Sequence, residues 1–357
     1  MRVYNFAAGP STLPPEVLKK AQAEFLDFAG TGMSVTEISH RDKAYEAVVK
    51  EAEALTRELL NVPDDYAVIF VQGGASTQFA AIPLNLMHNG VADYIVTGNF
   101  AKKAWQEGQI YGVANKIGDS SDKTYTYIPD VDKLNYTEGA DYVHITSNNT
   151  IFGSRYSKFP KCAAPLVADM SSEIFSREVN VADFGVIYAG AQKNLAPAGV
   201  TIVIAKRSLI DNPLKICPTM LKWKVQDENG SLYNTPPAFS IYMANLVLNN
   251  LKAKGGVKAM REQNDYKAKL LYDFIDNSKL YKNNVEPEFR SVMNVPFVTG
   301  SEELDAKFVA EAKKAGLVSL KGHRIVGGMR ASIYNAMPVE GVKALIEFMK
   351  KFEKENA

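Results

Sequence analysis

Short apolar runs alternate with helical patterns over the first half of the chain, and this alternation limits the possible folds more than any other feature. The runs are AVIFV at 67–71, DYIVT at 93–97, YVHIT at 142–146, PLVAD at 165–169 and GVIYA at 185–189. Stretches such as 77–88 and 101–112 lie between them. Strands that alternate with helices predict an α/β fold with a mainly parallel sheet covered on both faces.

The next apolar run, VTIVIA at 200–205, breaks this rhythm. It follows the run at 185–189 after only about ten residues, whereas a parallel crossover needs a dozen or more. We therefore expect this strand to pair antiparallel, which makes the sheet mixed. The Pro- and Asn-rich region around 211–240 is expected to be an extended loop, followed by a helical stretch that ends at Gly255-Gly256.

Beyond these glycines the pattern restarts in an α+β form. Helical stretches at 257–276, 302–314 and from 338 alternate with strand-like segments at 291–298 and 329–335. At about 150 residues per domain, the 357 residues also predict two domains. The expected division is an N-terminal arm at 1–15, a large domain at 16–256 and a smaller C-terminal domain at 257–357.

Charge and composition exclude several classes of protein. The 41 Lys and Arg balance 40 Asp and Glu, without the basic excess of a nucleic-acid-binding protein. The two cysteines, Cys162 and Cys217, cannot supply a disulfide framework. No uninterrupted apolar run of about 18 residues predicts a membrane span, and the N-terminus lacks the apolar segment of a signal peptide. We therefore expect a cytoplasmic protein with no nucleic-acid or membrane partner.

Several well-known catalytic motifs are absent from the sequence. There is no Walker-type phosphate loop, and Gly30-Thr-Gly32 fails as a dinucleotide fingerprint because it follows a helix and has Val35 in place of the third glycine. A G-x-S-x-G nucleophile elbow is also missing. The four histidines lie far apart without the i, i+4 spacing of a helical zinc site, so no metal is expected.

Three features remain at the predicted carboxyl ends of strands, where open α/β sheets bind ligands. They are the turn Gln72-Gly-Gly-Ala-Ser-Thr-Gln78, the carboxylate of Asp169 and the amine of Lys193. A glycine turn at a helix N-terminus can hold a phosphate, a lysine can form a Schiff base, and a carboxylate can keep a pyridine nitrogen protonated. Each feature also has an ordinary interpretation as a turn, a helix cap or a solvated lysine, but the ordered set predicts a pyridoxal-phosphate site.

Motifs spread along the whole chain resemble those of the phosphoserine aminotransferases, which are class V, fold-type I pyridoxal-phosphate enzymes. The matching segments are NFAAGPSTLP at 5–14, EISHR at 37–41, GGASTQFAAIPLNL at 73–86, ADMSSEIFSR at 168–177, YAGAQKNLAPAG at 188–199, YNTPPAFSIYM at 233–243 and GHRIVGGMRASIYNAM at 322–337. This resemblance implies a mainly parallel, mixed, seven-stranded sheet in the large domain and a smaller α+β C-terminal domain.

The resemblance also implies a set of cofactor-binding residues, with one pyridoxal 5'-phosphate per subunit. Lys193 would carry the Schiff base and move the substrate's Cα proton, and Asp169 would pair with the pyridinium nitrogen. The phosphate would contact Ala75, Ser76 and Gln192, while Thr150 would bind the phenolic oxygen. Asn234 and Thr235 would reach the phosphate from the neighbouring subunit, so that the active sites of a homodimer would be shared.

For the substrates, the resemblance implies a basic pocket. Arg330 would bind the α-carboxylate common to both substrates. His40 and Arg41, with His323 and Arg324 of the partner chain, would hold the distal phosphate or carboxylate. Exposed arginines are usually solvated, but planar guanidinium groups suit the oxygen atoms of a dianionic substrate.

Two positions depart from the pattern of the family. Many relatives stack a tryptophan on the cofactor ring where this chain has Phe100, which keeps an aromatic face with less area. Some bacterial members carry an arginine where Ser76 stands, so the distal pocket here has one cation fewer. We expect both changes to alter substrate affinity rather than to abolish the chemistry.

The reaction implied by the resemblance is ping-pong transfer of an amino group between L-glutamate and 3-phosphohydroxypyruvate. It gives O-phospho-L-serine and 2-oxoglutarate in serine biosynthesis, with a further role on 4-phosphohydroxy-L-threonine in pyridoxal phosphate biosynthesis. The alternatives are another class V enzyme, such as an alanine–glyoxylate transaminase or a cysteine desulfurase, and a non-catalytic cofactor-binding sensor. The basic cluster argues against the first two, whose substrates lack a distal phosphate, and the intact Lys193, Asp169 and Arg330 argue against the third.

Overall fold

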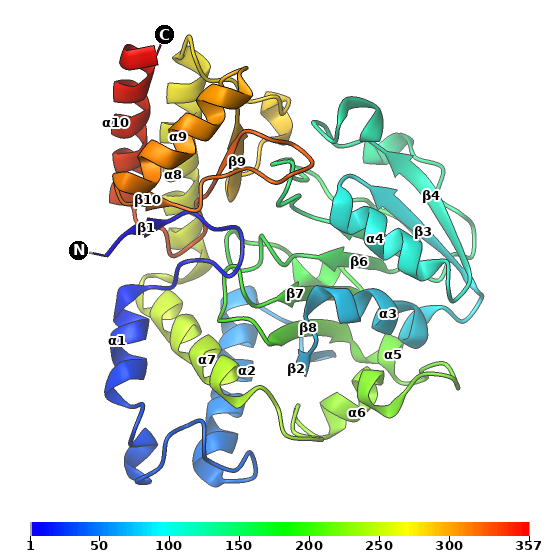
Figure 1. Cartoon of the computed structure of the whole chain (residues 1–357). Helices are drawn as coiled ribbons and strands as arrows, with labels where there is room; N and C mark the ends of the chain where they lie inside the picture. The colour runs from blue at the N-terminus through cyan, green and yellow to red at the C-terminus, as the bar shows by residue number, and fades with distance from the viewer. Residues whose placement is uncertain (1, 357) are drawn as a thin grey trace.

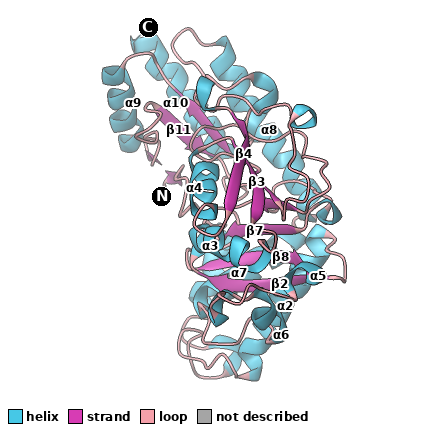
Figure 2. Cartoon of the chain, turned by 90° about the vertical axis from the view of Figure 1, so that its right-hand side faces the viewer, coloured by secondary structure: helices cyan, strands magenta, loops and turns pink. Residues whose placement is uncertain are grey.

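The computed structural model describes residues 2–356 and is built around a seven-stranded sheet (Figure 1). The strand order across this sheet is β2-β8-β7-β6-β5-β3-β4. The strands are β2 (Tyr66–Gln72), β3 (Val91–Val96), β4 (Val113–Asp119), β5 (Val143–Thr146), β6 (Leu166–Asp169), β7 (Val186–Gly190) and β8 (Val200–Lys206). Figure 2 shows β4, β3, β7, β8 and β2 following one another down the molecule.

The direction of β8 confirms the mixed sheet expected from the sequence. β8 pairs antiparallel with both β7 and β2, whereas the neighbouring pairs from β7 to β4 are all parallel. Since two antiparallel pairings restore the original direction, β2 runs parallel to β7. The carboxyl ends of β2, β3, β5, β6 and β7 therefore share one edge of the sheet, where open α/β sheets bind ligands.

Helices cover both faces of the sheet, as the alternating pattern predicts. On one face, α1 (Pro15–Ala23), α2 (Lys43–Leu60) and α7 (Ala238–Ala253) enclose the largest apolar cluster. On the other, α3 (Gly74–Leu86) and α4 (Asn99–Gly108) pack with the short α5 (Arg207–Ile210) and α6 (Trp223–Glu228) (Figure 1). The strands between the two layers are almost wholly buried, and their near-continuous apolar runs reflect this two-sided burial.

Two local features differ from the sequence-based expectations. The edge strand β4 has no apolar run, because several of its side chains are exposed or half-buried. The region 211–240 is not a continuous extended loop, since it contains α6, whose Trp223 is buried and donates to Gln78 at 3.0 Å.

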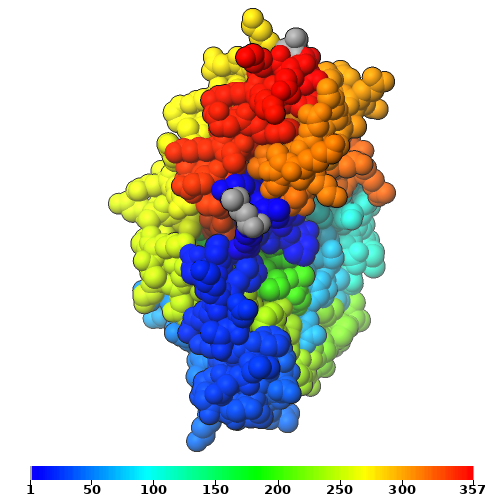
Figure 3. Space-filling view, turned by 60° about the vertical axis from the view of Figure 1, so that its left-hand side comes forward, coloured from blue at the N-terminus to red at the C-terminus, as the bar shows by residue number. Residues whose placement is uncertain are grey.

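The C-terminal part of the chain has its own apolar core. It comprises α8 (Gly256–Asn277), β9 (Asn294–Phe297), α9 (Glu302–Lys314), β10 (Leu317–Val318), β11 (Met329–Ser332) and α10 (Val339–Asn356). The N-terminal strand β1 (Tyr4–Asn5) pairs parallel with β10, and Phe6 joins this core. Figure 3 shows the N-terminal segment, in blue, passing directly below the red and orange C-terminal part. The boundaries at 15 and 256 stay a prediction.

Within residues 2–356, no helix combines the length and apolarity that a membrane crossing requires.

Candidate active site

Lys193 lies just beyond the carboxyl end of β7, in a turn that the N-terminal segment partly covers. Its side chain is half-buried, and its Nζ donates to Thr150 Oγ1 at 2.8 Å. The Nζ also lies 5.2 Å from the centre of the Phe100 ring. The amine is therefore held between a hydroxyl group from the segment after β5 and an aromatic face from the start of α4.

The charge state of Lys193 suits a nucleophilic amine. Burial lowers the pKa of Lys193 to about 8; the Asp169 carboxylate opposes this shift and the Arg330 guanidinium adds to it. A lysine with an ordinary pKa near 10.4 is almost entirely protonated at neutral pH. The lower pKa gives a larger fraction of the neutral form, which is the form that attacks a carbonyl.

Asp169 is a buried carboxylate at the end of β6. Its Oδ1 accepts hydrogen bonds from the Ser171 backbone N–H at 2.9 Å and from Ser171 Oγ at 2.6 Å, whereas Oδ2 accepts none from residues 2–356. Burial raises the pKa of Asp169, and both the Lys193 charge and the Ser171 hydrogen bonds oppose that shift. A cationic ligand group at Oδ2 would stabilise the ionised form.

Arg330 and Lys193 both donate to Thr150. The Nη1 atom of Arg330 donates to the Thr150 carbonyl oxygen at 3.1 Å, while its buried Nε has no hydrogen-bond partner. Arg330 forms no ion pair with the carboxylates of residues 2–356, and burial lowers its pKa. A half-buried guanidinium with a buried, unpartnered Nε and no counter-ion is costly unless an anion binds there, so the site is suited to a carboxylate.

The glycine turn adopts the backbone that a phosphate cradle requires. Gly73 and Gly74 have φ of 95° and 70°, and a Cβ on Gly73 would lie 2.0 Å from Thr77 Oγ1. The helix α3 begins at Gly74 without a side-chain cap, so the first-turn N–H groups, including those of Ala75 and Ser76, lack intrahelical acceptors. These N–H groups and the helix dipole favour an anion.

The imidazole of His323 lies close to Arg330 within the same chain, and the contribution of His323 and Arg324 to a partner chain's site stays a prediction. Burial lowers the pKa of His323, and the positive charges of Arg330, Arg324 and Lys103 lower it further. Lys103, which the sequence analysis did not single out, also lies 5.9 Å from the centre of the Phe100 ring. Its position one turn after Phe100 was the signal that could have indicated it.

The other residues expected to bind substrate or cofactor, such as His40, Arg41 and Thr235, form no hydrogen bond with Lys193 within residues 2–356 of a single chain. His40 is buried with an unpartnered Nε2, and Arg41 is exposed just before α2. Neither forms a hydrogen bond or ion pair with Lys193, Asp169 or Arg330 in the part of the chain that the structure describes. The Thr235 carbonyl oxygen accepts from Gln72 Nε2 at 3.0 Å.

Gln192 and Asn234 also lie near these segments. Gln192 is half-buried and its carbonyl oxygen accepts from the Ser11 N–H at 2.9 Å, which ties the N-terminal segment to the turn that carries Lys193. Asn234 lines a hollow together with Gln72 and Gly73 at the end of β2. The cofactor contacts expected of Gln192, Asn234 and Thr235 stay predictions.

Sequence reasoning missed a buried polar network that supports Thr150. Thr150 Oγ1 donates to Ser172 Oγ at 3.0 Å, and Asn148 Nδ2 donates to Ser172 Oγ at 2.8 Å and to Asn294 Oδ1 at 2.9 Å. Asn294 Nδ2 in turn donates to the Tyr334 hydroxyl at 3.1 Å. The network joins the lysine to the C-terminal core, and its members are too far apart in sequence to be recognised together.

His144 lies on β5, two residues before Thr146, the register partner of Asp169. Its Nε2 is 2.9 Å from the Tyr188 hydroxyl, and Tyr188 is the register neighbour of Asp169 on β7. Burial lowers the pKa of His144 to about 3, so this imidazole stays neutral. Its Nδ1 has no hydrogen-bond partner. The arrangement agrees with a structural histidine rather than a metal ligand.

Comparison with known proteins agrees with this geometry. Residues 3–345 match the family model for class V aminotransferases, so the chain belongs to that family. The chain is 56% identical to a phosphoserine aminotransferase of Bacillus cereus over 99% of both chains. It superposes on the solved phosphoserine aminotransferase of Bacillus circulans subsp. alkalophilus with a TM-score of 0.98 and 47% identity, covering 100% and 99% of the two chains.

A second solved relative, from Trichomonas vaginalis, contains bound pyridoxal phosphate; its TM-score is 0.94 at 40% identity, with 98% and 100% coverage. Within class V, the chain thus lies among the phosphoserine aminotransferases. It is an aminotransferase whose cofactor is pyridoxal phosphate. The amine of Lys193, the free oxygen of Asp169 and the N-terminus of α3 fit the aldehyde, the ring nitrogen and the phosphate of that group.

Proposed function

We propose that this enzyme transfers the amino group of L-glutamate to 3-phosphohydroxypyruvate, giving O-phospho-L-serine and 2-oxoglutarate. The observation that carries the proposal is the group of positive charges from Arg330, Arg324 and Lys103 around His323, since Arg330 donates to the same Thr150 as the lysine amine. The half-buried Arg330 without a counter-ion suits the α-carboxylate, and the further cations suit a second, distal anion. A glyoxylate or alanine site needs no such second group.

In this proposal each residue has one task. Bound pyridoxal phosphate supplies the electron sink that makes the substrate's Cα proton acidic. Lys193 would move that proton between the substrate's Cα and the C4′ carbon of the cofactor, and Thr150 holds the amine in position through the 2.8 Å hydrogen bond. Asp169 keeps the ring nitrogen protonated, and Arg330 orients the substrate by its carboxylate.

We further propose that the active form is a homodimer. Tyr233, directly before the expected phosphate contacts Asn234 and Thr235, is 44% exposed, and Leu26 in the segment before Arg41 is 82% exposed. Exposed apolar side chains beside residues expected to serve a neighbouring site are consistent with an interface. Sedimentation of the purified protein would show a dimer; a monomer with full activity would contradict this part of the proposal.

Sharing of the sites has its own test. A mixture of Lys193→Ala and Thr235→Ala subunits would regain activity if one intact site forms from two chains. No recovery after subunit exchange, with each variant shown to be folded, would place Thr235 outside the partner's site.

The same group of positive charges would accept the phosphate of 4-phosphohydroxy-L-threonine, so we include that amino acid as a second substrate. The pathways proposed for the enzyme are serine biosynthesis and pyridoxal phosphate biosynthesis, and the proposed location is the cytoplasm.

The absorbance of the bound cofactor tests the reaction in two halves. Glutamate should bleach the band of the aldehyde form, and 3-phosphohydroxypyruvate should restore it. Restoration by glyoxylate but not by 3-phosphohydroxypyruvate would retain the aminotransferase and reject the substrate assignment. No response to glutamate would reject glutamate as the donor.

A further inference from the structure

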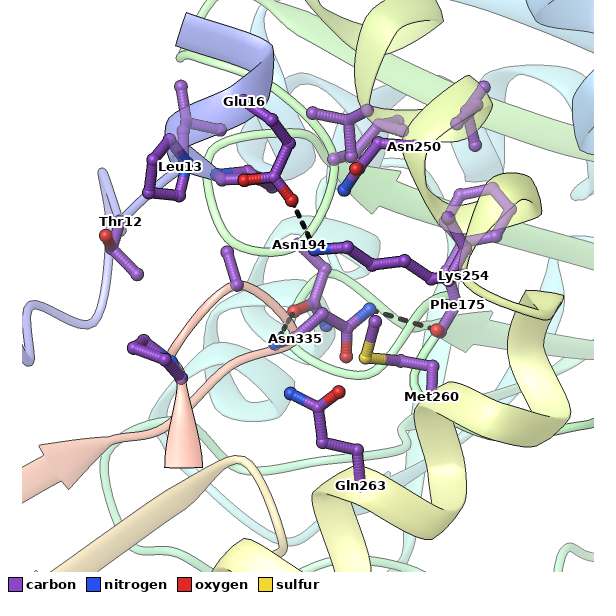
Figure 4. A pocket seen from close by; sticks show the side chains of 18 residues that line it. Thr12, Leu13, Glu16, Phe175, Asn194, Asn250, Lys254, Met260, Gln263 and Asn335 are labelled. Carbon is purple, nitrogen blue, oxygen red and sulfur yellow. Dashed lines mark hydrogen bonds and ion pairs between the residues drawn. The ribbon is translucent and has the colours of Figure 1, made fainter. Parts of the chain in front are cut away.

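A pocket of about 290 Å³ lies behind the lysine turn, separate from the active site (Figure 4). It is formed by the N-terminal segment at 12–16, the helices α7 and α8 with Lys254, the segment 335–338, and the loop residues Phe175, Asn194 and Leu195. Its volume is at the small end of the roughly 300–1,000 Å³ of ligand pockets. The space therefore suits a molecule of amino-acid size rather than a nucleotide.

The floor of the pocket is apolar and firmly held. Phe175, Leu251 and Met260 are each less than 9% exposed and line it. Between them, the Asn194 Oδ1 atom accepts from the Asn335 N–H at 3.1 Å, and Asn335 Nδ2 donates to the Phe175 carbonyl oxygen at 3.0 Å. Because these amides already have hydrogen-bond partners, they hold the floor in place. The apolar side chains of the floor are therefore in position before any ligand binds.

The rim carries polar groups, some of which are free. The side-chain amides of Asn250 and Gln263 line the pocket and make no hydrogen bond with residues 2–356. Glu16 of α1 and Lys254 at the end of α7 form an ion pair that spans the pocket in Figure 4. About half of each of these two side chains is exposed, so the pair is accessible and contributes little to stability.

We propose that this pocket is an effector site for a free α-amino acid with an apolar side chain. The ammonium group would pair with Glu16 and the carboxylate with Lys254, so that both charges stay neutralised when the ion pair opens. The side chain would cover Phe175 and Met260, where burial of apolar surface supplies the affinity. A carboxylic acid or an amine alone would leave one of the two charges without its partner.

Binding of a ligand in this pocket would affect the position of Lys193. Asn194 in the pocket wall directly follows Lys193, and Ser11 donates from its N–H to the Gln192 carbonyl oxygen and from its Oγ to the Lys193 carbonyl oxygen. Thr12, the next residue after Ser11, lines the pocket. Two walls of the pocket are thus continuous with the segments that position the lysine.

Calorimetric titration of the holoenzyme with L-leucine tests the proposal. We expect one leucine per subunit, at least about tenfold weaker binding in Glu16→Gln and Lys254→Met, and no comparable binding of 4-methylpentanoate. The matched control is Lys252→Met. It removes a similar ion pair of α7, in which Lys252 Nζ lies 2.6 Å from a Glu58 carboxylate oxygen, but this pair lies outside the pocket. This control should bind leucine like the wild type.

Kinetics provide the second readout, because leucine could also enter the active site. Leucine should change the KM for glutamate in the wild type and in Lys252→Met but not in Lys254→Met, whose activity without leucine should be unchanged. Absence of binding, equal binding in Lys254→Met, or an equal loss in Lys252→Met would overturn the proposal. Binding that leaves the KM for glutamate unchanged would overturn the effector role.

Discussion

Thr150 accepts hydrogen bonds from both Lys193 and Arg330, the first through its hydroxyl at 2.8 Å and the second through its carbonyl oxygen at 3.1 Å. One residue thus fixes the distance between the amine that moves the proton and the cation proposed to bind the carboxylate. The hydroxyl then donates to Ser172, which ties this arrangement to the buried network behind it.

Replacing Thr150 with valine should lower kcat by about tenfold or more, because the valine keeps the shape but removes the acceptor of the Lys193 hydrogen bond. Thr150→Ser should retain most of the activity. Steady-state kinetics on glutamate would measure both. Thr201→Val is the matched control, since Thr201 is also buried but its hydroxyl has no partner; equal losses in the two valine variants would contradict the positioning role.

The reaction of the apo-protein with pyridoxal phosphate should become faster as the pH rises through about 8, where Lys193 loses its proton. Asp169 stabilises the ammonium form, so Asp169→Asn should move this midpoint to lower pH. Arg330 destabilises that form, so Arg330→Gln should move the midpoint to higher pH. Stopped-flow absorbance measures the rates; shifts in the opposite directions, or a midpoint near 10 in the wild type, would disagree with the geometry.

Gly73→Ala should weaken cofactor binding strongly, because the new Cβ would lie 2.0 Å from Thr77 Oγ1 at a position with φ of 95° and would distort the first turn of α3. Gly90→Ala is the control, since its φ is 75° but no atom lies near the added Cβ. Equilibrium dialysis against pyridoxal phosphate compares the two. The control should bind normally and lose only about 1 kcal/mol of unfolding free energy; normal binding by Gly73→Ala would remove this turn from the cofactor site.

Lys267 should contribute to stability rather than directly to chemistry. Its ammonium is buried and donates to the carbonyl oxygens of Ile333, Tyr334 and Met337 at 2.8–3.0 Å. Lys267→Met should lower the unfolding free energy by about 3 kcal/mol, because it leaves buried acceptors without donors. Chemical denaturation measures the loss, and Lys269→Met on the exposed face of α8 should change it by less than about 0.5 kcal/mol.

The sheet was largely predictable because its strands are buried on both faces and therefore appear as apolar runs in the sequence. The short gap before 200–205 even indicated the antiparallel direction of β8. The edge strand β4 was not visible in the same way, because half-buried or exposed edge residues such as Asn115 and Lys116 need not be apolar. Trp223 was missed since its helix has only six residues and no extended period.

The site was predictable where one residue follows one strand, as with Asp169 and Lys193. The shared edge of the sheet then brings them together without any knowledge of loop geometry. Residues that meet in the fold but lie far apart in the sequence could not be predicted as a group from the residues alone. Lys103 of α4 acts on His323, which lies far away in the sequence, and Asn148 contacts Asn294 from 146 positions away in the chain.

The most direct test compares 3-phosphohydroxypyruvate with glyoxylate as amino acceptors from glutamate. If the cluster around His323 and Arg324 binds a distal phosphate, kcat/KM should favour 3-phosphohydroxypyruvate by about 100-fold or more, and Arg324→Leu should lose most of that preference while keeping the rate on glyoxylate. Equal kcat/KM values for the two acceptors in the wild type would contradict the account.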